Sequence, residues 1–248
     1  MNATSILALR QVRRHLRSRA RIIGLLGQPV LFLLALGFGL GATFSRAGQG
    51  DYVQFLTPGI VTMGVLSMGV FSGIEIVWDR QFGFLKETLV APVLRLEIVL
   101  GRTLGGATVA LLQGGIVFLV CLAAGFRPER LAALPLALLF VGLIAITCTA
   151  LGTAIGSTLK DMQGFQIITN FLVMPIFFFS GALFPTVGLP VEMQLAGRLN
   201  PLTYGVDGLR GALTGSFGFS ASTDIIVVVV FAALLLTVSA YSFSRIEA

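Results

Sequence analysis

Residue types that carry enzymatic chemistry are scarce in this sequence. Its one histidine is His15, and its two lysines are Lys86 and Lys160. Nucleophilic catalysis requires a nucleophile beside a base, and a phosphate-binding loop requires a glycine-rich turn followed by Lys and then Ser or Thr. Each lysine here precedes an acidic residue, Glu87 or Asp161, and neither follows a glycine-rich turn. The residues therefore predict no enzyme, and any ATP-driven work must come from another polypeptide.

The densest mixture of charged and bulky apolar side chains lies at residues 78–98, WDRQFGFLKETLVAPVLRLEI. Such a mixture is typical of a short helix that inserts into a groove of a partner protein. The residue before a proline disfavours helix, so Pro92 limits the predicted helix to about 79–90. A helix lying on the membrane surface is the alternative. The side chains expected to contact the partner are those of Asp79, Arg80, Phe82, Gly83, Phe84, Leu85, Lys86, Glu87 and Leu89.

Long apolar stretches must position this segment, and they predict a membrane protein. The chain is 56% hydrophobic and 11% charged, with a mean hydropathy of +0.94, whereas a soluble domain carries about 25% charged residues. About 20 apolar residues cross a hydrocarbon core as a helix, which satisfies its own backbone hydrogen bonds in lipid. We predict an all-α fold in one membrane domain, 1–248, with six spans at 22–44, 53–77, 99–124, 132–157, 165–184 and 223–243.

The basic residues predict the orientation of these spans. Twelve of the 17 Lys and Arg fall before residue 22, in 78–102, in 158–164 or after 243, all of which lie on one side of a six-span bundle. Because positive residues collect on the cytoplasmic side, both termini are expected in the cytoplasm. Residues 4–21 are predicted to form a basic amphipathic helix at the interface with membrane lipids, with a flexible tail as the alternative. The net charge of +6 thus reflects topology, and no nucleic-acid partner is expected.

The segment 185–222, on the opposite side, is too long for a turn and is divided by prolines and glycines. Two short helices are expected within it, at about 190–199 and 202–214. Short broken helices persist at membrane depth only where protein covers their backbone. We therefore predict a re-entrant pair that caps the extracellular end of the bundle, with an exposed loop as the alternative.

Polar residues within the spans need water or a partner, and their positions indicate which of the two each one finds. Glu75 and Asp224 lie near span ends, so each is expected to be solvated or paired with an arginine. Gln113 and Asn170 are expected to join helices by hydrogen bonds.

Small residues four positions apart allow helices to approach closely, and they are expected to mark packing interfaces. The pairs are Gly69 and Gly73, Gly101 and Gly105, and Gly152 and Gly156. The two cysteines lie inside spans and are expected to pack rather than to form a disulfide.

Several motifs, read in order, resemble the membrane subunit of the type-2 ABC exporter family. They are Gln28-Pro29, Phe55-Leu56-Thr57-Pro58-Gly59, the run Arg80, Gly83, Lys86, Glu87, Leu89 and Pro92-Val93, then Phe179-Ser180-Gly181-Ala182-Leu183-Phe184-Pro185, and Asn200-Pro201-Leu202-Thr203-Tyr204 with Asp207 and Arg210. The similarity extends over nearly the whole chain, and the order and spacing of the motifs are its most specific feature. The chain looks most like the small permeases of bacterial drug, antibiotic and lipid exporters.

The resemblance implies a fold, partners and a location. It implies that 79–90 is a coupling helix that docks on an ABC ATPase subunit, and that the outer helices carry a gate at Pro185, Asn200, Pro201, Tyr204, Asp207 and Arg210. It implies two ATPase subunits, which bind ATP and Mg, and a second permease copy in a homodimer or heterodimer. The chain itself is expected to bind no cofactor or metal, and to lie in the bacterial plasma membrane among its lipids.

The aromatic composition bears on the cargo. There are 20 Phe against one Trp and three Tyr, and phenylalanine walls suit apolar molecules. We expect ATP-driven export of a hydrophobic or amphipathic small molecule (a drug, antibiotic or lipid), and hence a role in multidrug efflux or antibiotic resistance. The path is expected to involve Glu75, Asn170, Phe171, Phe177 and Phe178. The alternatives are export of a polysaccharide or lipid-linked glycan, and a membrane assembly factor that transports nothing.

Overall fold

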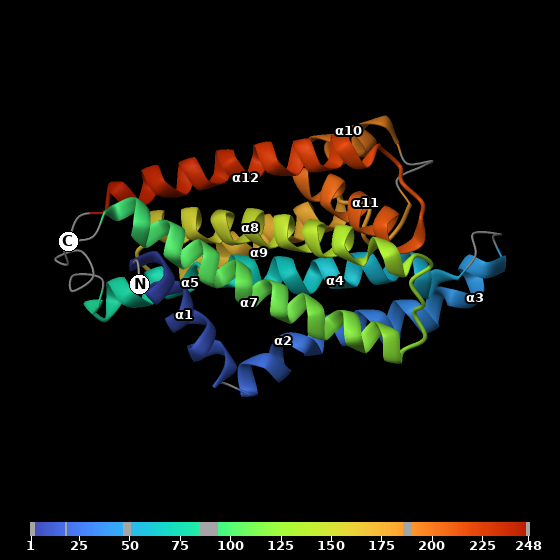
Figure 1. The fold of residues 1–248 in the computed structure, drawn as a ribbon, viewed down its shortest axis with the longest axis horizontal. Coiled ribbons are helices and arrows are strands. Elements are labelled where there is room, and N and C mark those ends of the chain that lie inside the picture. Colours follow the sequence, from blue (N-terminus) through green and yellow to red (C-terminus); the bar gives the residue numbers. More distant parts are fainter. Residues whose placement is uncertain (1–2, 18, 47–50, 85–93, 186–189, 247–248) are drawn as a thin grey trace.

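The computed structural model describes residues 3–17, 19–46, 51–84, 94–185 and 190–246, and within them every regular element is a helix. Five helical segments are long and apolar enough to cross a membrane: Ile23–Gly41, Tyr52–Gln81, Arg95–Ala123, Leu131–Thr158 and Ala221–Ser244. The all-α prediction is therefore confirmed for the described residues. The long helices run side by side along the longest axis of the molecule (Figure 1).

Helix α4 (Tyr52–Phe71) forms the centre of the bundle, and it packs against α7 (Arg95–Ala123) and α8 (Leu134–Thr158). It begins at Asp51, whose carboxylate accepts a hydrogen bond from the Val53 amide at 2.9 Å, an N-cap that satisfies one free donor of the first turn. Most of its length is buried inside the protein. A short 3₁₀ turn, η2 (Leu131–Ala133), leads into α8.

The predicted helix 4–21 is wrong at its C-terminal end. Helix α1 (Ala3–Leu16) ends there, and α2 (Arg19–Phe32) begins three residues later. Helix α1 lies across α7, where Gly101 and Gly105 leave room for its backbone. The chain must then change direction to enter the first predicted span, and this turn divides the basic segment into two helices (Figure 1).

The first predicted span, 22–44, is an irregular helix. Pro29 lies inside α2, a π-helix η1 follows at Leu33–Phe38, and α3 (Gly39–Arg46) completes the segment. Proline has no amide hydrogen to donate to the preceding turn, and wider helical turns commonly accommodate such interruptions. The irregularity of this span therefore takes the form of a π-helical segment after the proline.

The second predicted span, 53–77, differs in two respects. It breaks at Ser72 and Gly73, and α5 (Ile74–Gln81) then continues beyond it. A methyl group on Gly73 would overlap the carbonyl oxygen of Gly152 in α8, and one on Gly152 would overlap that of Val70. Two of the three glycine pairs predicted from the sequence thus mark close packing between α8 and the α4–α5 segment.

The predicted helix 79–90 is also wrong in its first part, because residues 79–81 are the last residues of α5. The helix ends at Gln81, and Gly83 has a φ of +79°, a left-handed conformation that glycine adopts without a steric penalty. Residues 85–90 of the predicted helix lie outside the described residues.

The predicted fifth span, 165–184, is shorter than expected. Helix α9 (Met162–Phe178) has 17 residues. It ends where the Ser180 hydroxyl donates to the Phe177 carbonyl at 2.6 Å and where Gly181 adopts a φ of +71°. These two residues turn the chain, so residues 179–184 do not extend the helix.

Helix α12 (Ala221–Ser244) corresponds to the predicted span 223–243 and packs along α8. A small apolar cluster joins its last turn to α5 and the start of α7, through Phe243, Ile246, Ile76 and Ile98. Residue Leu7 of α1 packs against the same cluster. The first and last described helices therefore meet at one end of the bundle, which we call the α5 end (Figure 1).

Two helices occur in the segment 185–222 where they were predicted. They are α10 (Val191–Leu199) and α11 (Pro201–Thr214), and they lie at the opposite end of the bundle, called here the α11 end (Figure 1). Nine of the 14 residues of α11 are buried, against α4, α8 and α12. Rings of Phe140 and Phe217 occupy the space that side chains at Gly208 and Gly211 would need. This helix is part of the protein core rather than an exposed loop.

Candidate functional site

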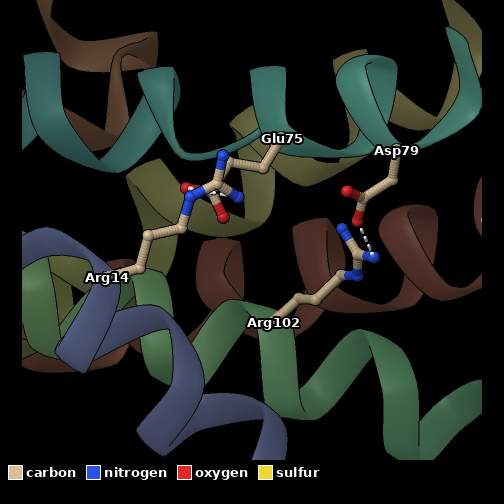
Figure 2. Close-up of polar contacts among 4 residues, drawn as sticks. All are labelled: Arg14, Glu75, Asp79 and Arg102. Atoms are coloured by element: carbon tan, nitrogen blue, oxygen red, sulfur yellow. Dashed lines mark hydrogen bonds and ion pairs between the residues drawn. The ribbon is translucent and has the colours of Figure 1, made fainter. Parts of the chain in front are cut away.

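An ion pair joins α5 to α7 at the α5 end. An Arg102 guanidinium nitrogen lies 2.5 Å from the Asp79 carboxylate, and only 13% and 14% of the two side chains are exposed. Figure 2 shows the two side chains facing each other between the helices. Such a charge-assisted hydrogen bond is stronger than a neutral one because donor and acceptor carry opposite charges. Shielding from water reduces the screening of their attraction.

A second, longer ion pair joins α1 to α5. Arg14 approaches Glu75 to 3.9 Å, with the arginine side chain 43% exposed (Figure 2). The expectation that Glu75 pairs with an arginine is confirmed. Both ion pairs line one cleft of about 30 Å³ between α1, α5 and α7. Ion pairs thus attach helix α5 to two neighbouring helices, α1 and α7.

Arg80 links the same helix to α8. Its guanidinium donates to the carbonyl oxygens of Leu159 at 2.7 Å and Ser157 at 3.1 Å. The last carbonyls of a helix have no partner within it and carry its negative dipole end, so an arginine there satisfies both the hydrogen bonds and the charge. The Gln81 amide adds a longer contact to the Lys160 carbonyl, at 3.4 Å.

Aromatic side chains project from the end of α5. Trp78, Phe82 and Phe84 are 42%, 61% and 54% exposed, and the rings of Trp78 and Phe82 are in contact, with centroids 5.6 Å apart. Asp79 and Arg80 bind within the protein, whereas these aromatics face outward. The remaining residues predicted to contact a partner, Leu85, Lys86, Glu87 and Leu89, lie outside the described residues.

The residues predicted for a cargo path are not brought together. Asn170 and Phe177 line a cavity of about 60 Å³ between α2, α4 and α9, whereas Phe171 is 81% exposed and Phe178 39% exposed. Glu75 lies in the charged cleft instead. This small cavity cannot enclose an amphipathic molecule, so the described chain holds no complete path at this position.

Two polar residues of the spans differ from expectation. Asp224 is fully buried in the first turn of α12, beside the carboxylate of Asp207 and without an arginine partner among the described residues. Gln113 is also fully buried, and its amide makes no described hydrogen bond. The prediction that Asp224 is solvated or paired with arginine is therefore wrong. The sequence places it near a helix end, but α11 covers that end.

The residues predicted at the outer gate do meet at the α11 end. Asn200 caps α11 by accepting from the Leu202 amide at 3.0 Å, while its own amide donates to the Ile176 carbonyl at 2.5 Å. Pro201 is the first residue of α11, and Pro185 is half-buried beyond α9. Asn200 therefore joins α11 to the end of α9.

The other three gate residues lie along α11. The Tyr204 hydroxyl donates to the Arg198 carbonyl at 2.9 Å. The Asp207 carboxylate accepts from the amides of Gly218 and Phe219 at 2.8–3.0 Å. Arg210 donates to the Gly181 carbonyl at 2.9 Å. Together they connect α11 to α10, to the turn before α12 and to the turn after α9.

An aromatic cluster that sequence reasoning missed packs beneath Arg210. The guanidinium lies 4.2 Å above the Phe55 ring, against which the Tyr52 ring stacks and the Phe44 ring packs at a tilt. The Tyr52 hydroxyl donates to the Leu183 carbonyl at 2.7 Å. Phe55 opens a motif noted in the sequence, but nothing in the sequence shows that α4 and α11 meet. Arg102 and Arg14 were likewise counted only as topology signals.

The fold and its ion-paired end define a class of protein: a multi-pass, all-helical membrane protein. A model of the ABC-2 type transporter family matches residues 2–214. The chain belongs to that family and is the permease of a type-2 ABC transporter. Permease domains of this family are not ATPases themselves, and the family implies an ABC ATPase partner.

Two kinds of relative are similar to this chain. Nodulation protein J of Rhizobium leguminosarum bv. trifolii is 32% identical over 200 residues, which cover 79% of this chain and 75% of that protein. Nodulation protein J of Sinorhizobium fredii is 31% identical over 219 residues, covering 87% and 82%. The putative transport permease ycf38 of Porphyra purpurea is 29% identical over 190 residues, covering 74% and 64%.

Proposed function

We propose that this permease belongs to an ATP-driven exporter and that its ATPase partner docks at the α5 end. One observation carries the proposal: three exposed aromatic side chains extend from a helix whose charged residues are bound inside the protein. An exposed apolar surface beside charged residues suits a partner groove. The predicted contact residues Leu85, Lys86, Glu87 and Leu89 follow directly in the chain.

Movement of α5 would reach the rest of the bundle through its three attachments. Asp79 pulls on α7 through Arg102, Arg80 pulls on the end of α8, and Glu75 connects to α1. These contacts are short or partly shielded, so they resist separation better than solvated pairs do. The ATPase would bind ATP and Mg, and this chain would convert its closure into helix movement.

The arrangement in the membrane is part of the same proposal. The α5 end carries most of the basic residues, so it would face the cytoplasm of a bacterial cell, with both termini there. Helix α9 would act as the sixth span, α1 as a helix at the lipid interface, and α10 and α11 as a re-entrant pair on the outside. Two permeases, as a homodimer or heterodimer, would assemble with two ATPase subunits.

For the cargo we propose an amphipathic molecule with a lipid tail, either a lipid or a lipid-linked glycan. The two relatives named Nodulation protein J are named for nodulation and not for drug efflux or antibiotic resistance. The exposed phenylalanines of α9 suit the apolar tail. The cavity at Asn170 and Phe177 is small, so the path would be completed by the second permease.

Docking is tested by expressing the permease with the products of neighbouring genes, co-purifying it with the ABC ATPase that associates with it, and measuring ATP hydrolysis in nanodiscs. Phe82→Ala and Lys86→Ala are expected to reduce both assembly and hydrolysis. Leu119→Ala, at a position 63% exposed in α7, is the matched control and should leave both unchanged. Normal assembly and hydrolysis in both test variants would refute docking at this end.

Cargo is tested separately, in proteoliposomes that contain the assembled transporter. Fluorescent lipid, lipid-linked glycan and an apolar drug are compared for ATP-dependent movement across the bilayer. Movement of the drug alone would overturn the cargo proposal without affecting the docking result.

A further inference from the structure

A polar pocket lies at the α11 end, between α10, α11 and the turn after α9. Its volume is about 290 Å³, and its lining residues are Ser180, Gly181, Gln194, Gly197, Arg198, Thr203, Asp207, Arg210, Gly218 and Phe219. Ligand pockets for whole small molecules usually measure about 300–1,000 Å³. This one therefore suits a headgroup rather than a complete lipid.

The charges that line the pocket are unequal. Arg198 and Arg210 contribute two guanidinium groups, and Asp207 is the one carboxylate among the lining residues. That carboxylate already accepts three hydrogen bonds from the backbone amides of Gly218 and Phe219. Its lone pairs are thus directed at the chain, and among the lining residues two positive charges stand against one negative charge. The buried carboxylate of Asp224 lies beside Asp207 and is not part of the lining.

Arg210 is a partly buried cation without an ion pair. Its described hydrogen bond goes to a neutral carbonyl, that of Gly181, and its Nε is buried without a partner. Among the described residues, no carboxylate oxygen lies within 4.0 Å of its guanidinium nitrogens. Burial lowers the pKa of Arg210 to about 10, an effect that the nearby Asp207 charge partly offsets. Arg210 therefore stays protonated at neutral pH, and it has no direct ion pair among the described residues, although the Asp207 charge nearby compensates it in part.

We propose that this pocket binds the anionic headgroup, phosphate or carboxylate, of an amphipathic molecule. Arg198, which is exposed, would reach the anion from the rim, and Arg210 would attract it from beneath. Thr203 and Gln194 add polar groups to the wall, while the rings of Phe219 and Tyr204, with centroids 5.1 Å apart, provide an apolar side. Arginine suits this task because its planar fork matches both phosphate and carboxylate.

The test measures binding to the purified full-length chain by calorimetry, so it requires neither an ATPase nor transport. The probes are dioctanoyl phosphatidylglycerol, uncharged dioctanoylglycerol and inorganic phosphate. Arg198→Glu reverses an exposed charge at the rim, and Gln194→Glu adds a negative charge without removing an arginine. Arg46→Glu, at the exposed end of α3 near the same end of the bundle, is the matched control (Figure 1).

Both pocket variants are expected to weaken phosphatidylglycerol binding by about tenfold or more, and the control by less than about twofold. Dioctanoylglycerol should bind at least about tenfold more weakly than phosphatidylglycerol to the unchanged protein. Displacement of the lipid by inorganic phosphate would identify a site for the free anion, and its failure would identify a lipid headgroup site. Wild-type affinity in both pocket variants, or equal binding of the uncharged lipid, would overturn the proposal.

Discussion

The ion pair between Asp79 and Arg102 permits a quantitative prediction about how α5 is held. Two unit charges about 4 Å apart attract by about 4 kcal/mol at an effective dielectric constant of about 20. Desolvation of two side chains that are only 13% and 14% exposed offsets part of that attraction. We expect a net coupling of about 1.5–3 kcal/mol between the two residues.

The assay is a double-mutant cycle on the free energy of unfolding of the purified permease in detergent. Asp79→Asn or Arg102→Gln alone should cost about 2–3 kcal/mol, because each leaves a largely buried charge without its partner. The double variant should cost clearly less than the sum of the two single variants. In the assembled transporter, the single variants should also reduce the stimulation of ATP hydrolysis by cargo.

The pair Arg14 and Glu75 provides the matched control in the same cleft. It is longer, at 3.9 Å, and its arginine is 43% exposed, so its coupling should be about 0.5 kcal/mol or less. Additive costs for Asp79→Asn and Arg102→Gln, or an equal coupling in the two pairs, would refute the argument that shielding from water makes this contact strong.

Three further predictions concern packing and capping. Gly152→Ala should lower the free energy of unfolding by about 1–3 kcal/mol, because its methyl group would overlap the Val70 carbonyl. Gly142→Ala is the control and should be nearly neutral, because no atom lies closer than 3.8 Å to the added methyl group. Thermal unfolding in detergent measures both variants. Arg80→Lys should lower the free energy of unfolding by about 1–2 kcal/mol in the same assay. The single lysine nitrogen must reach both carbonyls at the end of α8, which two separate guanidinium nitrogens reach now. Full stability would mean that one contact suffices. Asn200→Asp should keep the α11 cap but lose the hydrogen bond donated to the Ile176 carbonyl, and Asn200→Ala should lose both. The rate of proteolysis near α10 should therefore be higher in Asn200→Asp than in the unchanged protein, and highest in Asn200→Ala.

The sequence predicts the elements of this fold better than their connections. Hydropathy located five long helices, and the prolines and glycines located α10 and α11, because both signals are local. The ends were less accurate: α1 stops at Leu16 and α9 at Phe178. Those ends depend on packing against other helices and on turns at residues such as Gly181, which apolar content does not reveal.

In the candidate sites, too, local features were predicted better than contacts between distant residues. The sequence marked Asp79 and Arg80 as partner contacts, yet the structure directs both into the protein and leaves the neighbouring aromatics exposed. An arginine partner for Glu75 was foreseen, whereas the burial of Asp224 was not. Which arginine meets which carboxylate, or which helix covers a carboxylate, depends on contacts between residues far apart in the chain.

The crossing of α5 and α8 at Gly73, Gly152 and Gly156 limits how this permease can change shape. Backbone carbonyls there occupy the space that side chains on these glycines would need, so backbone packs against backbone and no side chain can change rotamer to absorb a sliding movement. Helices α4, α5 and α8 must then travel as a single rigid piece during any transport cycle. The deformation has to be taken up where the first span leaves the regular α-helical pattern, at its proline and its π-helical turns.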